Sequence, residues 1–78
     1  MRVLVVDDDS VLCHWLGSKL HSHGHSCRMV HDGAHALKAI KDEVYDVVLL
    51  DRMLPIMDGF TVLRELQGSR HPPIMLLS

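Results

Sequence analysis

The sequence has 78 residues, enough for one small domain, and 47% of them are hydrophobic, so the chain is built to bury a core. Its formal net charge of −2 provides no polycationic surface, which argues against direct binding of nucleic acid or of an anionic membrane by this segment. Cys13 and Cys27 have no CxxC spacing and are too few for a disulfide framework, so we expect reduced thiols and a cytoplasmic location.

A buried strand followed by an amphipathic helix is predicted at the start of the chain. Residues 3–6 are all apolar, as expected for a strand covered on both faces, but the run is too short for a signal peptide or a membrane span. Asp9 or Ser10 can cap the helix that follows. Leucines at every fourth position, with Trp15 beside them, predict that helix over residues 11–23, and we expect its apolar stripe, Trp15 included, to lie in the core. Gly24 is suited to end the helix.

The rest of the chain repeats this alternation. A second strand is expected over residues 26–30 and an Ala-rich helix over residues 34–43. A third strand, apolar from residue 47 onward, is expected over residues 46–50, and a third helix over residues 60–66. After two prolines that block a helix, residues 74–78 predict a fourth strand.

The βαβαβαβ order with short links predicts a parallel sheet with right-handed crossovers. The fourth strand is apolar at four consecutive positions, which is typical of a covered strand, yet it is the last element and lies at an edge in the simplest topology. An uncovered apolar edge promotes aggregation. We therefore expect either a fragment whose next elements are missing or cover by another copy of the chain, and we favour a fragment.

Two of the apolar strands end in acidic side chains, Asp7 and Asp8 after the first and Asp51 after the third. Open α/β sheets bind ligands beyond the carboxyl ends of their strands, so these carboxylates would converge if the two strands are neighbours. Such a cluster needs a cation, and oxygen ligands suit Mg²⁺ better than zinc. A carboxylate beside the cation can attack a phosphoryl group and form an aspartyl-phosphate, to which Ser78 could donate a hydrogen bond.

Four motifs stand out along the chain: Val5-Val6-Asp7-Asp8-Asp9, His31-Asp32-Gly33-Ala34-His35-Ala36-Leu37, Tyr45-Asp46-Val47-Val48-Leu49-Leu50-Asp51 and Met53-Leu54-Pro55-Ile56-Met57-Asp58-Gly59. Together they resemble a bacterial response-regulator receiver domain, most closely the OmpR/PhoB-like branch of two-component transcription regulators. The resemblance runs the whole length of the chain, in register. It implies the flavodoxin-like (CheY-like) α/β fold, a doubly wound parallel sheet, here truncated after the fourth strand with strand order 2-1-3-4.

The resemblance implies a role for each candidate site residue. Asp51 would be the phosphoacceptor, receiving a phosphoryl group from a sensor histidine kinase, and Asp7 and Asp8 would form the acidic pocket for Mg²⁺. The backbone carbonyl of Met53 would complete the metal ligands. Ser78 stands where the family has its switch hydroxyl, which turns toward the phosphoryl group. In the intact parent protein, phosphorylation would control transcription by shifting a two-state equilibrium.

By the same resemblance, residues 1–78 are a partial receiver domain. The family continues with a helix, a fifth strand that carries an essential Lys and a last helix, and a DNA-binding domain follows in the OmpR/PhoB-like branch. None of these is present in the sequence. Without the family's last helix, part of the stripe on residues 11–23 would be exposed. The exposed edge of the fourth strand also offers a route to self-association.

Two other functions stay open. The chain could be an interaction module, a truncated receiver that binds a kinase or a full-length relative without accepting phosphate. Alternatively, Asp7-Asp8-Asp9-Ser10 superficially fits the nucleophile motif of haloacid-dehalogenase-like phosphohydrolases, with Asp7 as the nucleophile and Asp9 as the acid/base. That interpretation would make the chain an enzyme, which a receiver is not expected to be, and it leaves Asp51 without a role.

Overall fold

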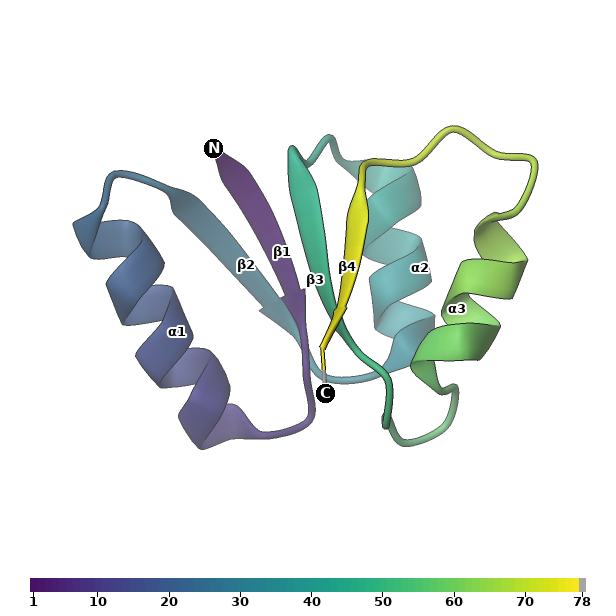
Figure 1. Cartoon of the computed structure of the whole chain (residues 1–78), viewed down its shortest axis with the longest axis horizontal. Coiled ribbons are helices and arrows are strands. Elements are labelled where there is room, and N and C mark those ends of the chain that lie inside the picture. Colours follow the sequence, from purple (N-terminus) through teal and green to yellow (C-terminus); the bar gives the residue numbers. More distant parts are fainter. Residues whose placement is uncertain (78) are drawn as a thin grey trace.

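The computed structural model describes residues 1–77, and in this part of the chain four strands alternate with three helices (Figure 1). Each predicted element is present, and every end within the described residues lies within one residue of its predicted position. None of the helices described is long and apolar enough to cross a membrane. In chain order the elements are β1 (Arg2–Val6), α1 (Ser10–Ser22), β2 (Ser26–Val30), α2 (Gly33–Asp42), β3 (Val47–Asp51), α3 (Gly59–Leu66) and β4 (Ile74–Leu77).

The four strands form one parallel sheet in the predicted order, β2-β1-β3-β4, so β1 and β3 are neighbours at its centre. Val5 of β1 pairs with Met29 of β2 on one side and with Leu49 of β3 on the other, and Leu50 pairs with Leu76 of β4. Because all strands run in the same direction, their carboxyl ends share one edge of the sheet, the lower edge in Figure 1.

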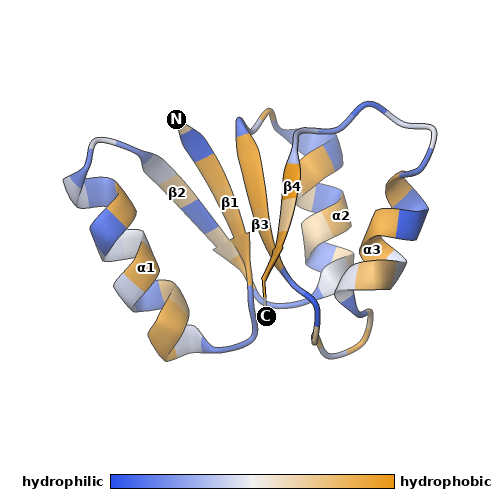
Figure 2. Ribbon diagram, in the orientation of Figure 1, coloured by the Kyte–Doolittle hydropathy of each residue, from blue (hydrophilic) through white to orange (hydrophobic). Residues whose placement is uncertain are grey.

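The helices cover the two faces of the sheet unequally, with α1 on one face and α2 and α3 on the other (Figure 1). The larger core cluster lies under α2 and α3, where alternate residues Leu4, Val6, Val48 and Leu50 are fully buried. Figure 2 shows that β1 and β3 are hydrophobic along most of their length, as expected for strands covered on both faces. The smaller cluster lies under α1 and has three buried members, Val3, Val5 and Cys13.

Aspartates begin the three helices and glycines follow two of them. The side chains of Asp9, Asp32 and Asp58 accept hydrogen bonds of 2.8 to 3.1 Å from backbone N–H groups two or three residues further on. Gly24 follows α1 with φ of 84° and Gly68 follows α3 with φ of 80°, a left-handed conformation that favours glycine. Local capping chemistry thus sets the ends of these elements.

Trp15 lies outside the core, contrary to the prediction for α1. Its side chain is 56% exposed, and the ammonium nitrogen of Lys19 lies 5.8 Å from the centroid of its ring. The buried residue of α1 is Cys13. α1 packs closely on β2 through Gly17, where an added Cβ would lie 2.7 Å from the terminal methyl carbon of Met29. Trp15, two positions before Gly17, therefore points to the opposite side of the helix.

β4 lies at an edge of the described sheet, as predicted, and is only partly covered. Met75 is 57% exposed and Leu76 is 39% exposed, whereas Val48 and Leu50 of the neighbouring strand β3 are fully buried. β4 is therefore apolar throughout, yet some of its side chains are exposed at the edge of the described sheet.

A network of polar side chains joins β1, β2 and the segment after α2 at the amino-terminal edge of the sheet. The Glu43 carboxylate accepts hydrogen bonds from the Tyr45 hydroxyl at 2.9 Å, from the Arg2 guanidinium at 3.2 Å, and from Arg28. Arg2 also donates to the carbonyl of Val44 at 2.9 Å. These hydrogen bonds, that of Tyr45 first among them, hold the pKa of Glu43 below its ordinary value.

Glu43→Gln is expected to destabilise the fold at neutral pH but not in acid. The pKa of Glu43 is lower in the folded state, so its charged form contributes stability above the ordinary value of 4.5, and this contribution disappears as the pH falls through the folded-state pKa. Urea unfolding of both proteins over a pH series measures the difference. Glu65→Gln, at an exposed position of α3, is the control. A difference that does not change with pH would contradict this role for Glu43.

Candidate functional site

Three carboxylates meet at the carboxyl edge of the sheet. Asp7 and Asp8 follow β1, Asp51 ends β3, and the pairing of Val6 with Leu50 brings the two strand ends side by side. One carboxylate oxygen from each acid lies within 4.8 Å of the others. Across residues 1–77, no other set of three or more His, Cys, Asp or Glu brings its ligand atoms together in this way. The structure therefore brings together the acids that the sequence singles out.

The three acids differ in burial. Asp7 is only 5% exposed, Asp51 is intermediate and Asp8 is exposed. Burial raises the pKa of the Asp7 carboxyl above its ordinary value; the backbone N–H of Asp9, at 2.9 Å, partly opposes this, and the negative charges of Asp51 and Asp8 raise the pKa further. A cation in the cluster would replace this repulsion with attraction, so the electrostatics of the site favour a positive ion.

The backbone of Asp7 is held on both sides. Its N–H donates to the carbonyl of Val30 at 3.1 Å, which continues the pairing of β1 with β2 by one residue. Its carbonyl accepts from Nδ1 of His31 at 2.9 Å and from Sγ of Cys13 at 3.4 Å. Because a carbonyl only accepts, Nδ1 of His31 carries a proton in this hydrogen bond. Neither His31 nor Cys13 was assigned to the site from the sequence, since a side chain that bonds to a distant backbone atom leaves no sequence pattern.

Backbone hydrogen bonds hold the loop after Asp51 at its start and at its end. Oδ1 of Asp51 accepts the N–H of Met53 at 3.1 Å, which orients the carboxylate. The N–H of Gly59 donates to the carbonyl of Arg52 at 3.0 Å and closes the loop at its base. A Cβ at Gly59 would lie 2.6 Å from the carbonyl oxygen of Asp51, so the close approach of the two chain segments requires a glycine there.

The same loop contains a strained turn. The N–H of Met57 donates to the carbonyl of Pro55 at 2.7 Å, and Ile56 between them has φ of 69°. A hydrogen bond across three residues with a positive central φ is typical of the γ-turn that is rare and strained, and a β-branched residue is unusual in that conformation. Backbone strain of this kind clusters at functional sites, and here it lies five residues after Asp51.

The remaining candidate residues lie around the cluster or outside the described chain. Asp58, in an Asp-Gly pair typical of turns, caps α3 by accepting the N–H of Thr61 at 2.8 Å. Ser78 lies outside the residues that the structure describes. A hollow of about 470 Å³ beside the cluster is lined by Asp8, Met53, Leu54, Pro55 and Asp58.

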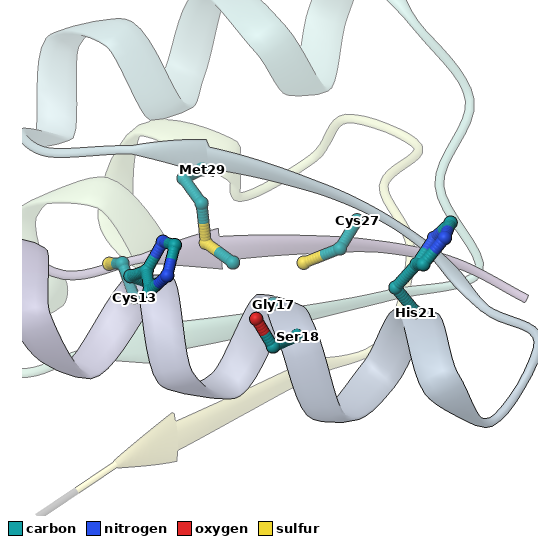
Figure 3. A pocket seen from close by; sticks show the side chains of 7 residues that line it. Cys13, Gly17, Ser18, His21, Cys27 and Met29 are labelled. Atoms are coloured by element: carbon teal, nitrogen blue, oxygen red, sulfur yellow. The ribbon is translucent and has the colours of Figure 1, made fainter.

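A separate hollow of about 360 Å³ lies between α1 and β2 (Figure 3), with Cys13, His14, Ser18, His21, Cys27 and Met29 in its lining. Burial raises the pKa of both thiols, so Cys13 and Cys27 stay neutral at physiological pH. A neutral thiol is a poor nucleophile and a poor metal ligand. The thiol of Cys13, in the lining of this hollow, donates to the carbonyl of Asp7 at the acidic site.

A comparison of the sequence with known protein families finds a family that agrees with this fold and with the acidic cluster. A sequence model described as the response regulator receiver domain matches residues 3–78. The chain therefore belongs to the response regulator receiver domain family.

Its relatives among curated proteins include two mycobacterial regulators. The chain is 42% identical over 77 residues to the DNA-binding response regulator MtrA of Mycobacterium tuberculosis (strain H37Rv) and 39% identical over 79 residues to the response regulator MprA of the same species (strain H37Ra). These alignments cover 99% and 100% of this chain but 34% of each relative. The chain thus spans about a third of the length of the curated relatives it matches.

Solved structures agree with the family and confirm the CheY-like fold. The receiver domain of the Francisella response regulator 1452 matches with a TM-score of 0.90 and 34% identity, covering 99% of this chain and 64% of that one. The receiver domain of the sensor histidine kinase PA1611 from Pseudomonas aeruginosa PAO1 matches with a TM-score of 0.92 and 30% identity, covering 99% and 66%. The PA1611 domain has a magnesium ion coordinated in its active site cleft.

Asp7→Asn is expected to stabilise the metal-free fold at neutral pH. The pKa of Asp7 is higher in the folded state, so its ionisation opposes folding as the pH rises above the ordinary value of 3.8. The amide removes this charge, while its oxygen can still accept the N–H of Asp9. Thermal unfolding in the presence of a chelator, measured over a pH series, should show the largest increase in Tm for Asp7→Asn near neutral pH and no increase in strong acid. Glu65→Gln is the control. If Asp7→Asn is less stable than the natural chain at neutral pH, the destabilising effect assigned to the Asp7 charge is refuted.

Proposed function

We propose that this chain is the phosphoacceptor part of a receiver domain in two-component signal transduction, and that Asp51 accepts a phosphoryl group from a sensor histidine kinase. The observation that carries this proposal is the cluster of carboxylate oxygens within 4.8 Å at the ends of β1 and β3, in a chain of the receiver family. Asp51 suits the acceptor role because it is partly exposed and is oriented by the N–H of Met53, whereas Asp7 is buried.

Mg²⁺ is the cofactor that we assign to the cluster. The proposed ligands are the carboxylates of Asp7, Asp8 and Asp51 and the backbone carbonyl of Met53. All of these donors are oxygens, and so few protein ligands leave positions for the waters that Mg²⁺ usually keeps. The raised pKa of the buried Asp7 supports the assignment, since a cation stabilises its charged form. When bound, Mg²⁺ would neutralise charge on the phosphoryl group and on its acceptor.

The chain's own residues supply and orient the nucleophile. A carboxylate oxygen of Asp51 attacks the phosphorus of the donor's phosphohistidine; the new O–P bond forms as the N–P bond breaks, and the histidine nitrogen keeps the electron pair. The hydrogen bond from Met53 to Oδ1 of Asp51 fixes the plane of the carboxylate before the donor arrives. Ser78 is proposed to donate a hydrogen bond to the transferred group.

In a longer parent protein, we propose that this phosphorylation controls transcription in the cytoplasm. The support comes from the curated relatives, of which MtrA is described as a DNA-binding response regulator and is about three times the length of the matched segment. The segment itself has a net charge of −2, so direct contact with DNA is assigned to other parts of such a protein.

The hydrolase alternative fits the site poorly. Its acid/base would be Asp9, but Oδ1 of Asp9 accepts the N–H groups of Val11 and Leu12 at 3.0 and 3.1 Å and caps α1. Its nucleophile would be Asp7, which is 5% exposed. The interaction module differs from our proposal only in whether Asp51 accepts phosphate, so one experiment separates them.

Asp51→Asn is expected to abolish phosphorylation. With Mg²⁺ and a small phosphodonor such as phosphoramidate, the natural chain should gain the mass of one phosphoryl group, and hydroxylamine should remove it as it does acyl phosphates. Asp58→Asn, which keeps a capping side chain, should be modified like the natural chain. If the natural chain binds Mg²⁺ but gains no phosphoryl group, Asp51 is not a phosphoacceptor in this chain and the proposed function is wrong.

We further propose that the chain self-associates through β4. The support is that Met75 is 57% exposed on the sheet face that carries α1, beside the partly buried Val47 and Leu49, while β4 lies at the edge of the described sheet. An apolar edge of this kind is a template for pairing with a second copy.

Met75→Lys is expected to shift the chain toward the monomer. A charge on this face opposes burial against a second copy, and lysine on edge strands prevents pairing in natural sheets. Sedimentation at several concentrations measures the change, and Arg70→Lys, at an exposed position before β4, is the control. A natural chain that is monomeric at all concentrations would refute self-association.

A further inference from the structure

Gly33 forms the contact between α2 and the loop that follows Asp51. It is the first residue of α2 and is buried. A Cβ placed on it would lie 2.4 Å from the carbonyl oxygen of Met57, 2.8 Å from the Cβ of Met57 and 2.8 Å from Cγ2 of Val62. Because real Cβ contacts essentially never fall below 3.0 Å, the loop backbone can approach α2 this closely only with a glycine at this position.

The need for glycine at this position comes from packing and not from backbone conformation. The positive-φ glycines of the described chain are Gly24 and Gly68, so Gly33 has a conformation that alanine also adopts. Alanine is the better helix former by about 1 kcal/mol in a helix interior. Any loss of stability or of Mg²⁺ binding caused by Gly33→Ala therefore results from the contact between Gly33 and the loop.

The loop has two kinds of external support. The side chains of Leu54 and Met57 pack against the larger core cluster, but such packing can adjust through rotamer changes. The carbonyl of Met57 against Gly33 is a contact between two backbones, which cannot adjust without moving the loop. The strained conformation of Ile56, next to Met57, persists only if its surroundings hold it in place.

We propose that Gly33 is a positioning residue for the acidic site. The first turn of α2, which has no side chain at Gly33, supports the loop at Met57 and thereby sets the position of the Met53 carbonyl relative to Asp51. The inference rests on the proposed function, in which that carbonyl is a ligand of Mg²⁺. Residues that position metal ligands without touching the metal typically change metal affinity by 10- to 100-fold when they are altered.

The test compares Mg²⁺ binding by the natural chain and by Gly33→Ala, followed through amide NMR shifts. The added methyl must push the carbonyl of Met57 away, so the Kd for Mg²⁺ should rise by about 10-fold or more. All titrations include trimethylamine N-oxide, which favours the folded state of each variant.

Gly24→Ala is the matched control for lost stability. Gly24 has φ of 84°, so alanine there is strained, but nothing lies within 4 Å of its added Cβ. It follows α1 at the opposite edge of the sheet from the acids. Its Kd for Mg²⁺ should stay within about twofold of the natural value even if the fold is weakened to the same extent, because no site residue moves.

If Gly33→Ala does not fold, a double variant with Gly33→Ala and Val62→Ala is used in its place. The Kd of this double variant is then compared with that of Val62→Ala alone. Removing Cγ2 of Val62 makes room for the methyl on one side, but the carbonyl of Met57 remains in its way. Weaker Mg²⁺ binding by the protein that carries Gly33→Ala in either comparison supports the inference. Equal Kd values with normal binding by the natural chain overturn the inference alone, whereas no Mg²⁺ binding by the natural chain overturns the proposed function as well.

Discussion

The pairing of β1 with β3 is the constraint on which the site depends, because it holds like charges together. Coulomb repulsion between two charges about 4 Å apart ranges from ~1 kcal/mol in water to ~4 kcal/mol at a protein surface. This repulsion is opposed by apolar burial in the two strands, where four side chains are fully buried: Leu4, Val6, Val48 and Leu50. Burial of each such side chain stabilises the fold by about 1.5–3 kcal/mol. The apolar burial is large enough to offset this repulsion, so the acids can be held close before any cation binds.

The two halves of the core contribute differently to this arrangement. The half under α2 and α3 contains most of the buried residues and also supports the loop after Asp51, through Leu54, Met57 and Gly33. The half under α1 is smaller, and the thiol of its buried Cys13 donates to the carbonyl of Asp7 at the site. The loop after Asp51 is therefore held by the better-packed half of the molecule.

The elements and the acidic cluster were predictable from the sequence, whereas the orientation of α1 and the shape of the loop were not. An apolar run that ends in an acid marks both a buried strand and the site at its tip, so Asp7 and Asp51 could be placed on one edge. Trp15 was misplaced because helical periodicity gives a stripe but not the part of the sheet that the stripe faces. Ile56 gave no signal, since isoleucine is not expected at positive φ and only its surroundings hold it there.

Gly33 shows a further limit of pattern-based prediction and also explains how the loop can be ready for a ligand. Its role depends on the absence of a side chain. An Asp-Gly pair is common in turns, so the sequence alone does not indicate that Gly33 contacts Met57. Backbone contacts at Gly33 and Gly59 restrict the positions that the loop can adopt. A loop ordered in advance loses less conformational entropy on binding, and this favours affinity at a site with few protein ligands. The strain at Ile56 is then a cost of the fold, offset by the core before any ligand arrives.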